Sequence, residues 1–233
     1  MNRMKTGDVS IEVAGSRLTG YLARPSMPGP GVLVLHAWWG LNDFFKQMCD
    51  RLAGEGFLVF APDLNFGKIA STVAEAEGLD GSRDFEAMQT AAVNAVRLLK
   101  EQVAQQGETQ FTNAGIALVG FSMGASWSML LASNMPEGIR AVVLFYGMEG
   151  VELDPVRAAF QGHFAETDEY TRREWADELK NDLRGRGLRT EFHHYPGTGH
   201  WFFESDRPEA YSQSDAELAW QRMVTFLRRE LAG

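Results

Sequence analysis

The residues with the clearest chemical potential are Gly120 to Gly124, which read G-F-S-M-G. They stand between a predicted buried strand and a predicted helix, the context in which a G-x-S-x-G pattern forms a nucleophile elbow. Glycines let the chain turn tightly there, so the Ser122 hydroxyl points outward at the carboxyl end of the strand. Five matching residues alone also occur in plain glycine-rich turns. The surrounding strand and helix therefore favour a nucleophilic serine.

A serine hydroxyl is a weak nucleophile and needs a base that is itself held by a third group. The chain has five histidines: His36, His163, His193, His194 and His200. In such a strand-and-helix arrangement the acid and then the base follow the nucleophile, which favours His200, beyond the last predicted strand. His193 and His194 are neighbours in a strand and should point to opposite faces. His36 is expected to satisfy backbone groups of its loop, and His163 to be a strand residue.

Three carboxylates follow the predicted strand at 158–164, namely Glu166, Asp168 and Glu169. Asp168 is favoured as the group that orients the base, because it lies a few residues beyond the strand end. Glu169 is the main alternative.

Acyl transfer also needs hydrogen-bond donors for the developing oxyanion. The backbone amide after the nucleophile, that of Met123, is one candidate, and an amide from the loop at 36–42 is the other. Trp38 is the best candidate in that loop. Packing of the Trp38 and Trp39 rings is compatible with this role, since only the backbone would donate.

Strands and helices alternate along the chain, which predicts an α/β fold with a mostly parallel central sheet and helices on both faces. An opening β-hairpin is expected from residues 9–13 and 18–22. The following strands are expected at 31–35, 57–61, 116–119, 141–145, 158–164 and 190–195. Helices should begin near 42, 84 and 123, pass through Trp175 and Leu179, and open last at Ser214 with capping-box spacing to Glu217. Residues 65–83 are expected to form a long loop or a short irregular helix, and the sequence leaves open whether they form a lid.

Composition fits one globular domain over residues 1–233. Apolar residues make up 45% and charged residues 23%, and the net charge is −9. This balance disfavours nucleic acid and anionic membranes as partners and favours a small molecule. A single cysteine excludes an internal disulfide, and no metal or cofactor is expected. The start of the chain shows no apolar signal segment, so a cytoplasmic location is expected.

Beyond these features, the sequence resembles the dienelactone hydrolase family of α/β hydrolases over nearly its whole length. The resemblance rests on five segments: 36–42 (H-A-W-W-G-L-N), 61–64 (A-P-D-L), 120–124, 162–168 (G-H-F-A-E-T-D) and 195–202 (Y-P-G-T-G-H-W-F). It implies an α/β-hydrolase fold, a catalytic triad of Ser122, Asp168 and His200, and an oxyanion hole from the Trp38 and Met123 amides.

Two departures from that family bear on the chemistry. Its namesake enzymes carry a cysteine nucleophile with a glutamate in the oxyanion loop, where this chain has Ser122 and Ala37. A thiol with a pKa near ~8.5 can ionise and benefits from a controlling carboxylate, whereas a serine stays protonated until a base acts. The two changes are therefore consistent with each other. An arginine that binds the substrate carboxylate is also missing shortly after His200, where the segment 201–204 ends in Glu204. An acid there argues against an anionic lactone, although Lys68, Arg83 or Arg207 could compensate.

The sequence therefore predicts a cofactor-free serine hydrolase that cleaves a small carboxylic ester or lactone through an acyl-enzyme on Ser122. Aromatic residues are expected to line an apolar substrate pocket: Trp39, Trp201, Phe202 and Phe203, beside Trp38. A thioesterase or peptidase with the same triad, or a catalytically silent scaffold that binds a ligand, remains an alternative. A monomer and a small homo-oligomer are equally compatible with the sequence.

Overall fold

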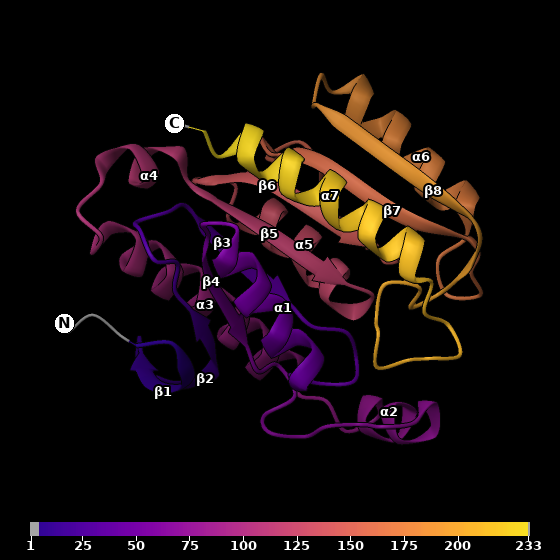
Figure 1. The fold of residues 1–233 in the computed structure, drawn as a ribbon, viewed down its shortest axis with the longest axis horizontal. Coiled ribbons are helices and arrows are strands. Elements are labelled where there is room, and N and C mark those ends of the chain that lie inside the picture. Colours follow the sequence, from indigo (N-terminus) through magenta and orange to yellow (C-terminus); the bar gives the residue numbers. More distant parts are fainter. Residues whose placement is uncertain (1–4, 233) are drawn as a thin grey trace. The chain divides into compact units, whose positions relative to one another are not determined.

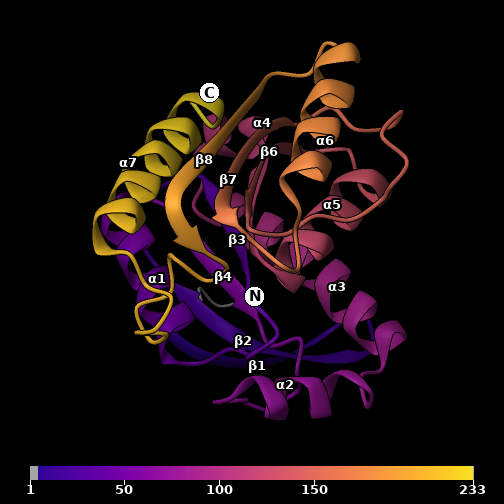
Figure 2. The same ribbon diagram turned by 90° about the vertical axis from the view of Figure 1, so that its right-hand side faces the viewer.

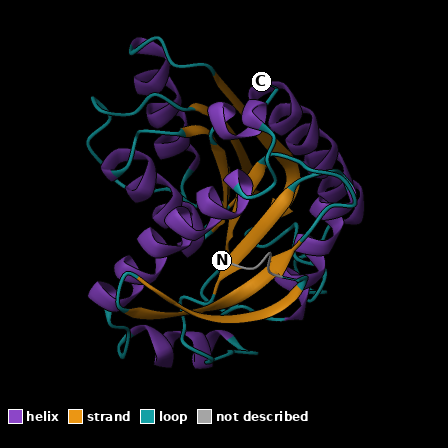
Figure 3. Cartoon of the chain, turned by 90° about the vertical axis from the view of Figure 1, so that its left-hand side faces the viewer, coloured by secondary structure: helices purple, strands orange, loops and turns teal. Residues whose placement is uncertain are grey.

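The computed structural model of the chain describes residues 5–232. This part of the chain forms two compact units, residues 5–116 and residues 117–232. In each unit the strands (orange in Figure 3) are covered by helices (purple) and joined by loops (teal).

The first unit contains four strands among its described residues, in the order β1-β2-β4-β3. Their bounds are Gly7–Val13 for β1, Ser16–Ala23 for β2, Gly31–Leu35 for β3 and Leu58–Pro62 for β4. β1 and β2 form the predicted antiparallel hairpin, whose turn is made by Ala14 and Gly15, both with positive φ. β4 pairs antiparallel with β2 and parallel with β3.

The helices of the first unit are α1 (Asp43–Gly54), α2 (Val73–Asp80), α3 (Phe85–Ala104) and α4 (Thr109–Ala114). α1 and α3 cover opposite faces of its strands (Figure 2). This two-sided cover explains why every residue of β3 and β4 is buried and apolar. The Asn42 and Asp84 side chains cap α1 and α3 by accepting from the Phe45 and Ala87 amides, so both predicted starts are confirmed.

Residues 65–83 contain a regular helix, α2, where the sequence predicted a loop or an irregular helix. The Thr72 hydroxyl caps α2 by accepting from the Glu75 amide. α2 shows little amphipathic pattern because most of its residues are exposed, and a helix without an apolar face gives no periodic signal.

The second unit has the strand order β5-β6-β7-β8. The bounds are Ile116–Phe121 for β5, which begins at the last residue of the first unit, Ile139–Phe145 for β6, Ala159–Thr167 for β7 and Thr190–Gly199 for β8. β7 pairs parallel with both β6 and β8. α7 (Gln213–Glu230) lies along one face, on β6 and β7, while α5 (Met123–Asn134) and α6 (Arg173–Gly185) lie on the other (Figures 1 and 2).

α7 begins two residues earlier than predicted, with Ser212 rather than Ser214 as its N-cap. The Ser212 hydroxyl donates to the Asp215 carboxylate three residues later. Ser212 and Asp215 have the same spacing as the predicted pair, Ser214 and Glu217, so spacing alone does not distinguish the two starts.

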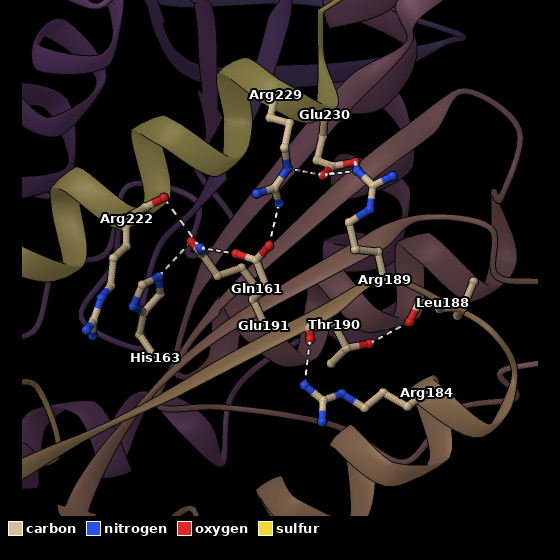
Figure 4. Close-up of polar contacts among 10 residues, drawn as sticks. All are labelled: Gln161, His163, Arg184, Leu188, Arg189, Thr190, Glu191, Arg222, Arg229 and Glu230. Atoms are coloured by element: carbon tan, nitrogen blue, oxygen red, sulfur yellow. Dashed lines mark hydrogen bonds and ion pairs between the residues drawn. The ribbon is translucent and has the colours of Figure 1, made fainter.

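Polar side chains fasten the end of α7 to β8 (Figure 4). The Arg229 guanidinium donates to Glu191 on β8 and to Glu230 on its own helix, and Arg189 also contacts Glu230. Glu230 is only 7% exposed, so its carboxylate is held by two arginines at the edge of the core. These contacts fix the strand that leads to His200.

The predicted α/β class, with mostly parallel strands, helices on both faces and an N-terminal hairpin, is confirmed. Among the helices described here, none combines the length and the apolar character needed to cross a lipid bilayer.

Candidate active site

Ser122 lies at a sharp turn between β5 and α5. Its backbone has φ +50° and ψ −112°, a conformation that a residue with a side chain rarely adopts. The Ser122 amide donates to the Phe145 carbonyl (2.9 Å), which ties the turn to β6. A Cβ at Gly120 would collide with the Gly124 carbonyl and the Ser128 hydroxyl. Glycine is therefore required at 120 for the turn to close, as the motif predicted.

Asp168 directly follows β7, and its two carboxylate oxygens have separate partners. Oδ1 accepts from the Tyr170 and Thr171 amides, at 2.9 Å each. Oδ2 lies 2.7 Å from His200 Nδ1. Glu166 instead accepts from the Gly197 amide, and Glu169 is exposed. Of the three carboxylates considered from the sequence, Asp168 is thus the one in contact with the imidazole.

His200 directly follows β8 and lies between the serine and the aspartate. Its Nε2 is 3.0 Å from Ser122 Oγ, while Nδ1 faces Asp168. Both distances suit a tautomer in which Nδ1–H donates to the carboxylate and Nε2 accepts from the hydroxyl. The His200 side chain is 5% exposed and that of Asp168 3%, so the contacts are shielded from bulk water. The structure brings the three residues together within the second unit.

His36 has the structural role expected from the sequence. Its Nδ1 lies 2.6 Å from the Ala37 carbonyl oxygen, and its Nε2 accepts from the Leu64 amide (3.0 Å). Complete burial lowers the pKa of His36 below its usual value. The ring is therefore a neutral link between two loop segments.

The remaining histidines belong to the packing of β7 and β8. His163 Nδ1 lies 2.7 Å from the Tyr195 hydroxyl, and its Nε2 lies 3.0 Å from Gln161 Oε1. The His193 ring faces His163, whereas the His194 ring packs near Phe164 and Asp177. The two neighbours thus point to opposite faces, as the strand period predicted.

The loop that follows β3 is stabilised around Trp38. The Gly40 amide donates to the Ala37 carbonyl and closes a tight turn, with Gly40 at φ +93°. The Trp38 carbonyl accepts from Asn65 Nδ2 (2.9 Å) and from the Arg83 guanidinium (3.1 Å). Met123, the other predicted oxyanion donor, is the first residue of α5. That the Trp38 and Met123 amides together form an oxyanion hole stays a prediction.

The predicted pocket residues differ in their surroundings. Trp201, with φ +67°, places its ring 4.9 Å from the His200 ring and 5.5 Å from the Tyr170 ring. Phe202 and Phe203 are buried and pack against other aromatic rings of the second unit. Trp39 is 1% exposed and meets Trp38 edge to face. Packing is the observed role of these rings, and substrate contact stays a prediction.

Sequence reasoning missed one buried pair beside the base. The Tyr146 hydroxyl donates to Glu204 Oε1 (2.7 Å), and the Tyr146 ring lies 4.9 Å from the His200 ring. Burial raises the pKa of Tyr146 well above its usual value, and the Glu204 carboxylate adds to the effect. Glu204 is fully buried, so the interpretation that it repels an anionic substrate is replaced by an internal role. The two residues are 58 positions apart, and nothing near either of them in the sequence indicates its partner.

The sequence matches the dienelactone hydrolase family over residues 18–231. The chain belongs to the dienelactone hydrolase family. Among its relatives is Protein usf of Aquifex pyrophilus, with 31% identity over 230 residues, covering 96% of this chain and 98% of that protein. Membership makes this protein a hydrolase that acts on esters or lactones.

Solved structures show the same α/β-hydrolase fold. A dienelactone hydrolase-like promiscuous phosphotriesterase from metagenomic libraries superposes with a TM-score of 0.79 at 21% identity, and each chain is covered completely. Thermogutta terrifontis Est2, a thermophilic esterase with propionate bound, gives a TM-score of 0.70 at 15% identity, covering 97% of this chain and 93% of that one. The fold expected from the resemblance is thus confirmed for this family member.

Proposed function

We propose that this dienelactone hydrolase family member is a serine hydrolase, which cleaves a small carboxylic ester or lactone through an acyl-enzyme on Ser122. The observation that carries the proposal is the position of His200, 3.0 Å from Ser122 Oγ and 2.7 Å from Asp168 Oδ2. These distances meet the geometric requirement for a nucleophile, a base and an orienting acid.

The reaction proceeds in two halves. His200 Nε2 takes the proton of Ser122 as Oγ attacks the substrate carbonyl, and Asp168 stabilises the resulting imidazolium. The Trp38 and Met123 amides donate to the tetrahedral oxyanion. His200 then gives its proton to the departing alkoxide, which leaves the acyl group on Ser122. Water, deprotonated by His200, attacks the acyl-enzyme, and the proton returned to Ser122 releases the carboxylic acid.

The substrate class follows from the family and from what the site contains. Thermogutta terrifontis esterase 2 has been seen phosphonylated by sarin and with propionate bound, both small groups. The aromatic rings around His200 suit an uncharged, apolar substrate. The reaction as written needs no metal or cofactor.

The test is turnover of p-nitrophenyl esters, neutral lactones and dienelactones by the wild-type protein and by Ser122→Ala. We expect hydrolysis of at least one ester or lactone series, and a loss of about 10⁶ in kcat for the variant with an unchanged circular dichroism spectrum. Ser126→Ala, one turn further along α5, is the matched control and should keep its activity within about threefold.

Near-normal turnover by Ser122→Ala would refute the assignment of the nucleophile. A folded wild-type protein without turnover of any ester, lactone, thioester or peptide anilide would favour a ligand-binding scaffold instead. Preference for thioesters or anilides would retain the triad and change the substrate class.

A further inference from the structure

Tyr146 lies beside the loop that carries the acid of the proposed triad and beside the ring of its base. It directly follows β6, which lies between β5, the strand of Ser122, and β7, the strand of Asp168. We propose that Tyr146, anchored by Glu204, is a positioning residue that keeps Asp168 and His200 in the geometry for proton transfer. The inference rests on the proposed function, in which His200 is the base.

The first contact of Tyr146 is with the loop after β7, which carries Asp168. Its carbonyl oxygen accepts from the Thr171 hydroxyl (3.1 Å) in a buried environment. The amide of the same Thr171 donates to Asp168 Oδ1 (2.9 Å). One threonine thus connects the backbone of Tyr146 to the carboxylate that orients the base.

The second contact is with the loop after β8, which carries His200 and Glu204. Glu204 lies four residues after His200 in a run of turns, in which the Glu204 amide donates to the Trp201 carbonyl. Its carboxyl group accepts from the Tyr146 hydroxyl at 2.7 Å, the usual length of an O–H···O hydrogen bond. The Tyr146 ring lies 4.9 Å from the His200 ring and 5.7 Å from the Phe202 ring. The side chain therefore fixes both the imidazole and the loop that carries it.

The backbone of Tyr146 adopts a conformation that its neighbours must maintain. Its φ is +36°, outside the range that a residue with a side chain prefers, and its amide donates to the His163 carbonyl (2.9 Å). The next residue, Gly147, is so close to the elbow that a Cβ there would collide with the Ser122 carbonyl oxygen. The segment 146–147 thus lies beside the loops of all three residues of the proposed triad.

The hydrogen bond between residues 146 and 204 depends on the side-chain types at these two positions. Burying a carboxylate is unfavourable unless donors compensate, and the phenol supplies one such donor. Phenylalanine at 146 keeps the ring but removes this donor from a fully buried acid. Glutamine at 204 keeps an acceptor for the phenol, removes the charge and turns the second oxygen into an amide donor. These two substitutions separate the hydrogen bond from ring packing and from the carboxylate charge.

The experiment compares Tyr146→Phe, Glu204→Gln and the double variant Tyr146→Phe/Glu204→Leu with the wild type. The readouts are kcat, KM, melting temperature and the rate at which a fluorophosphonate labels Ser122. Tyr195→Phe is the matched control, since it also removes a buried phenol hydroxyl, one that contacts His163 instead of a triad loop.

We expect Tyr146→Phe to lower kcat and the labelling rate about 10- to 100-fold, with KM within about twofold, because small displacements of reacting groups have effects of this size. Glu204→Gln should stay within about threefold of the wild type in kcat. The double variant should recover much of the melting temperature, since it leaves no buried acid behind, but not kcat.

A merely structural role gives a different pattern. Recovery of both stability and kcat in the double variant, or a kcat for Tyr146→Phe within about twofold of that for Tyr195→Phe, would overturn the proposal. If Tyr146→Phe alone does not fold, the double variant still decides between the two roles. Retained activity in Ser122→Ala would refute the proposed function itself, so the two failures are distinguishable.

Discussion

At the scale of single residues, Asp168 shows how a carboxylate is prepared for one task. Two backbone amides hold Oδ1, which leaves Oδ2 directed at His200 Nδ1. A carboxylate fixed in this way selects the tautomer in which Nδ1 carries the proton and Nε2 faces the serine. Its role in the proposed reaction is therefore to orient the base as much as to supply charge.

Asp168→Asn tests this role. The asparagine amide would donate to Nδ1 and stabilise the tautomer that cannot accept the Ser122 proton, so we expect kcat to fall about 10⁴-fold near neutral pH. Steady-state kinetics on the best p-nitrophenyl ester measures the effect. Glu169→Gln, the neighbouring exposed carboxylate, should change kcat less than about twofold, and equal losses in the two variants would contradict the assignment of the acid.

Trp38→Pro tests the proposed oxyanion donor, because proline has no amide hydrogen. Trp38 occupies the second position of the turn from Ala37 to Gly40, where proline is favoured, so the turn should survive. We expect kcat to fall about 10²- to 10³-fold. Trp38→Leu retains the amide and should stay well above the proline variant. Similar kcat values for the two variants would assign the donor elsewhere.

The sequence predicted Ser122 as the nucleophile from the G-x-S-x-G pattern after a buried strand, and His200 as the base because it follows the last predicted strand in a glycine-containing loop. It could not predict the contact between Tyr146 and Glu204. That contact forms only when the segments that follow β6 and β8 come together in the folded chain, and nothing near either residue in the sequence indicates the partner.

At the scale of helices and strands, burial explains both what could be predicted and what could not. β3, β4 and β5 are buried along their whole length, so their continuous apolar runs identify them. β8 extends to Gly199, four residues beyond its predicted end, through a segment that contains Pro196 and Gly197. The register shift between Ala165 and Thr167 lets β7 pair with this irregular end, and no residue-by-residue propensity anticipates it.

The pairing of β7 with β8 places His163 opposite His193, which makes stability depend on pH. Burial lowers the pKa of His163 well below its usual value and that of His193 to about 4. The unfolded chain binds these protons near pH 6.5 and the folded chain does not, so stability is complete above that pH and decreases below it. Each group contributes at most ~1.4 kcal/mol per pH unit in that range.

We therefore expect the melting temperature to fall between pH 7 and pH 5, and His163→Gln to show a smaller fall from its own value at pH 7. Thermal unfolding followed by circular dichroism across this range measures both. His194→Gln, on the opposite face of β8, is the control for loss of a less buried histidine. A pH dependence of stability unchanged in His163→Gln would contradict the neutral, buried state of this ring.

At the scale of the whole molecule, the alternation of predicted strands and helices predicted the class of fold, and composition predicted the class of partner. The match to the family over residues 18–231 agrees with the predicted fold. The single domain expected for residues 1–233 stays a prediction, since the described residues group into two compact units. Chain-wide composition could not show where the catalytic groups meet. That information lies in the strand order of the second unit. It brings together Ser122, Asp168 and His200, which follow the ends of β5, β7 and β8.

The most direct test of the proposed chemistry is covalent labelling of the intact protein with a fluorophosphonate, followed by mass spectrometry of its peptides. We expect one adduct per chain, on the peptide that contains Ser122. It should be absent in Ser122→Ala and form at least about 100-fold more slowly in His200→Ala, because the hydroxyl then lacks its base. Labelling of another residue, or an unchanged rate in His200→Ala, would contradict a serine nucleophile activated by His200.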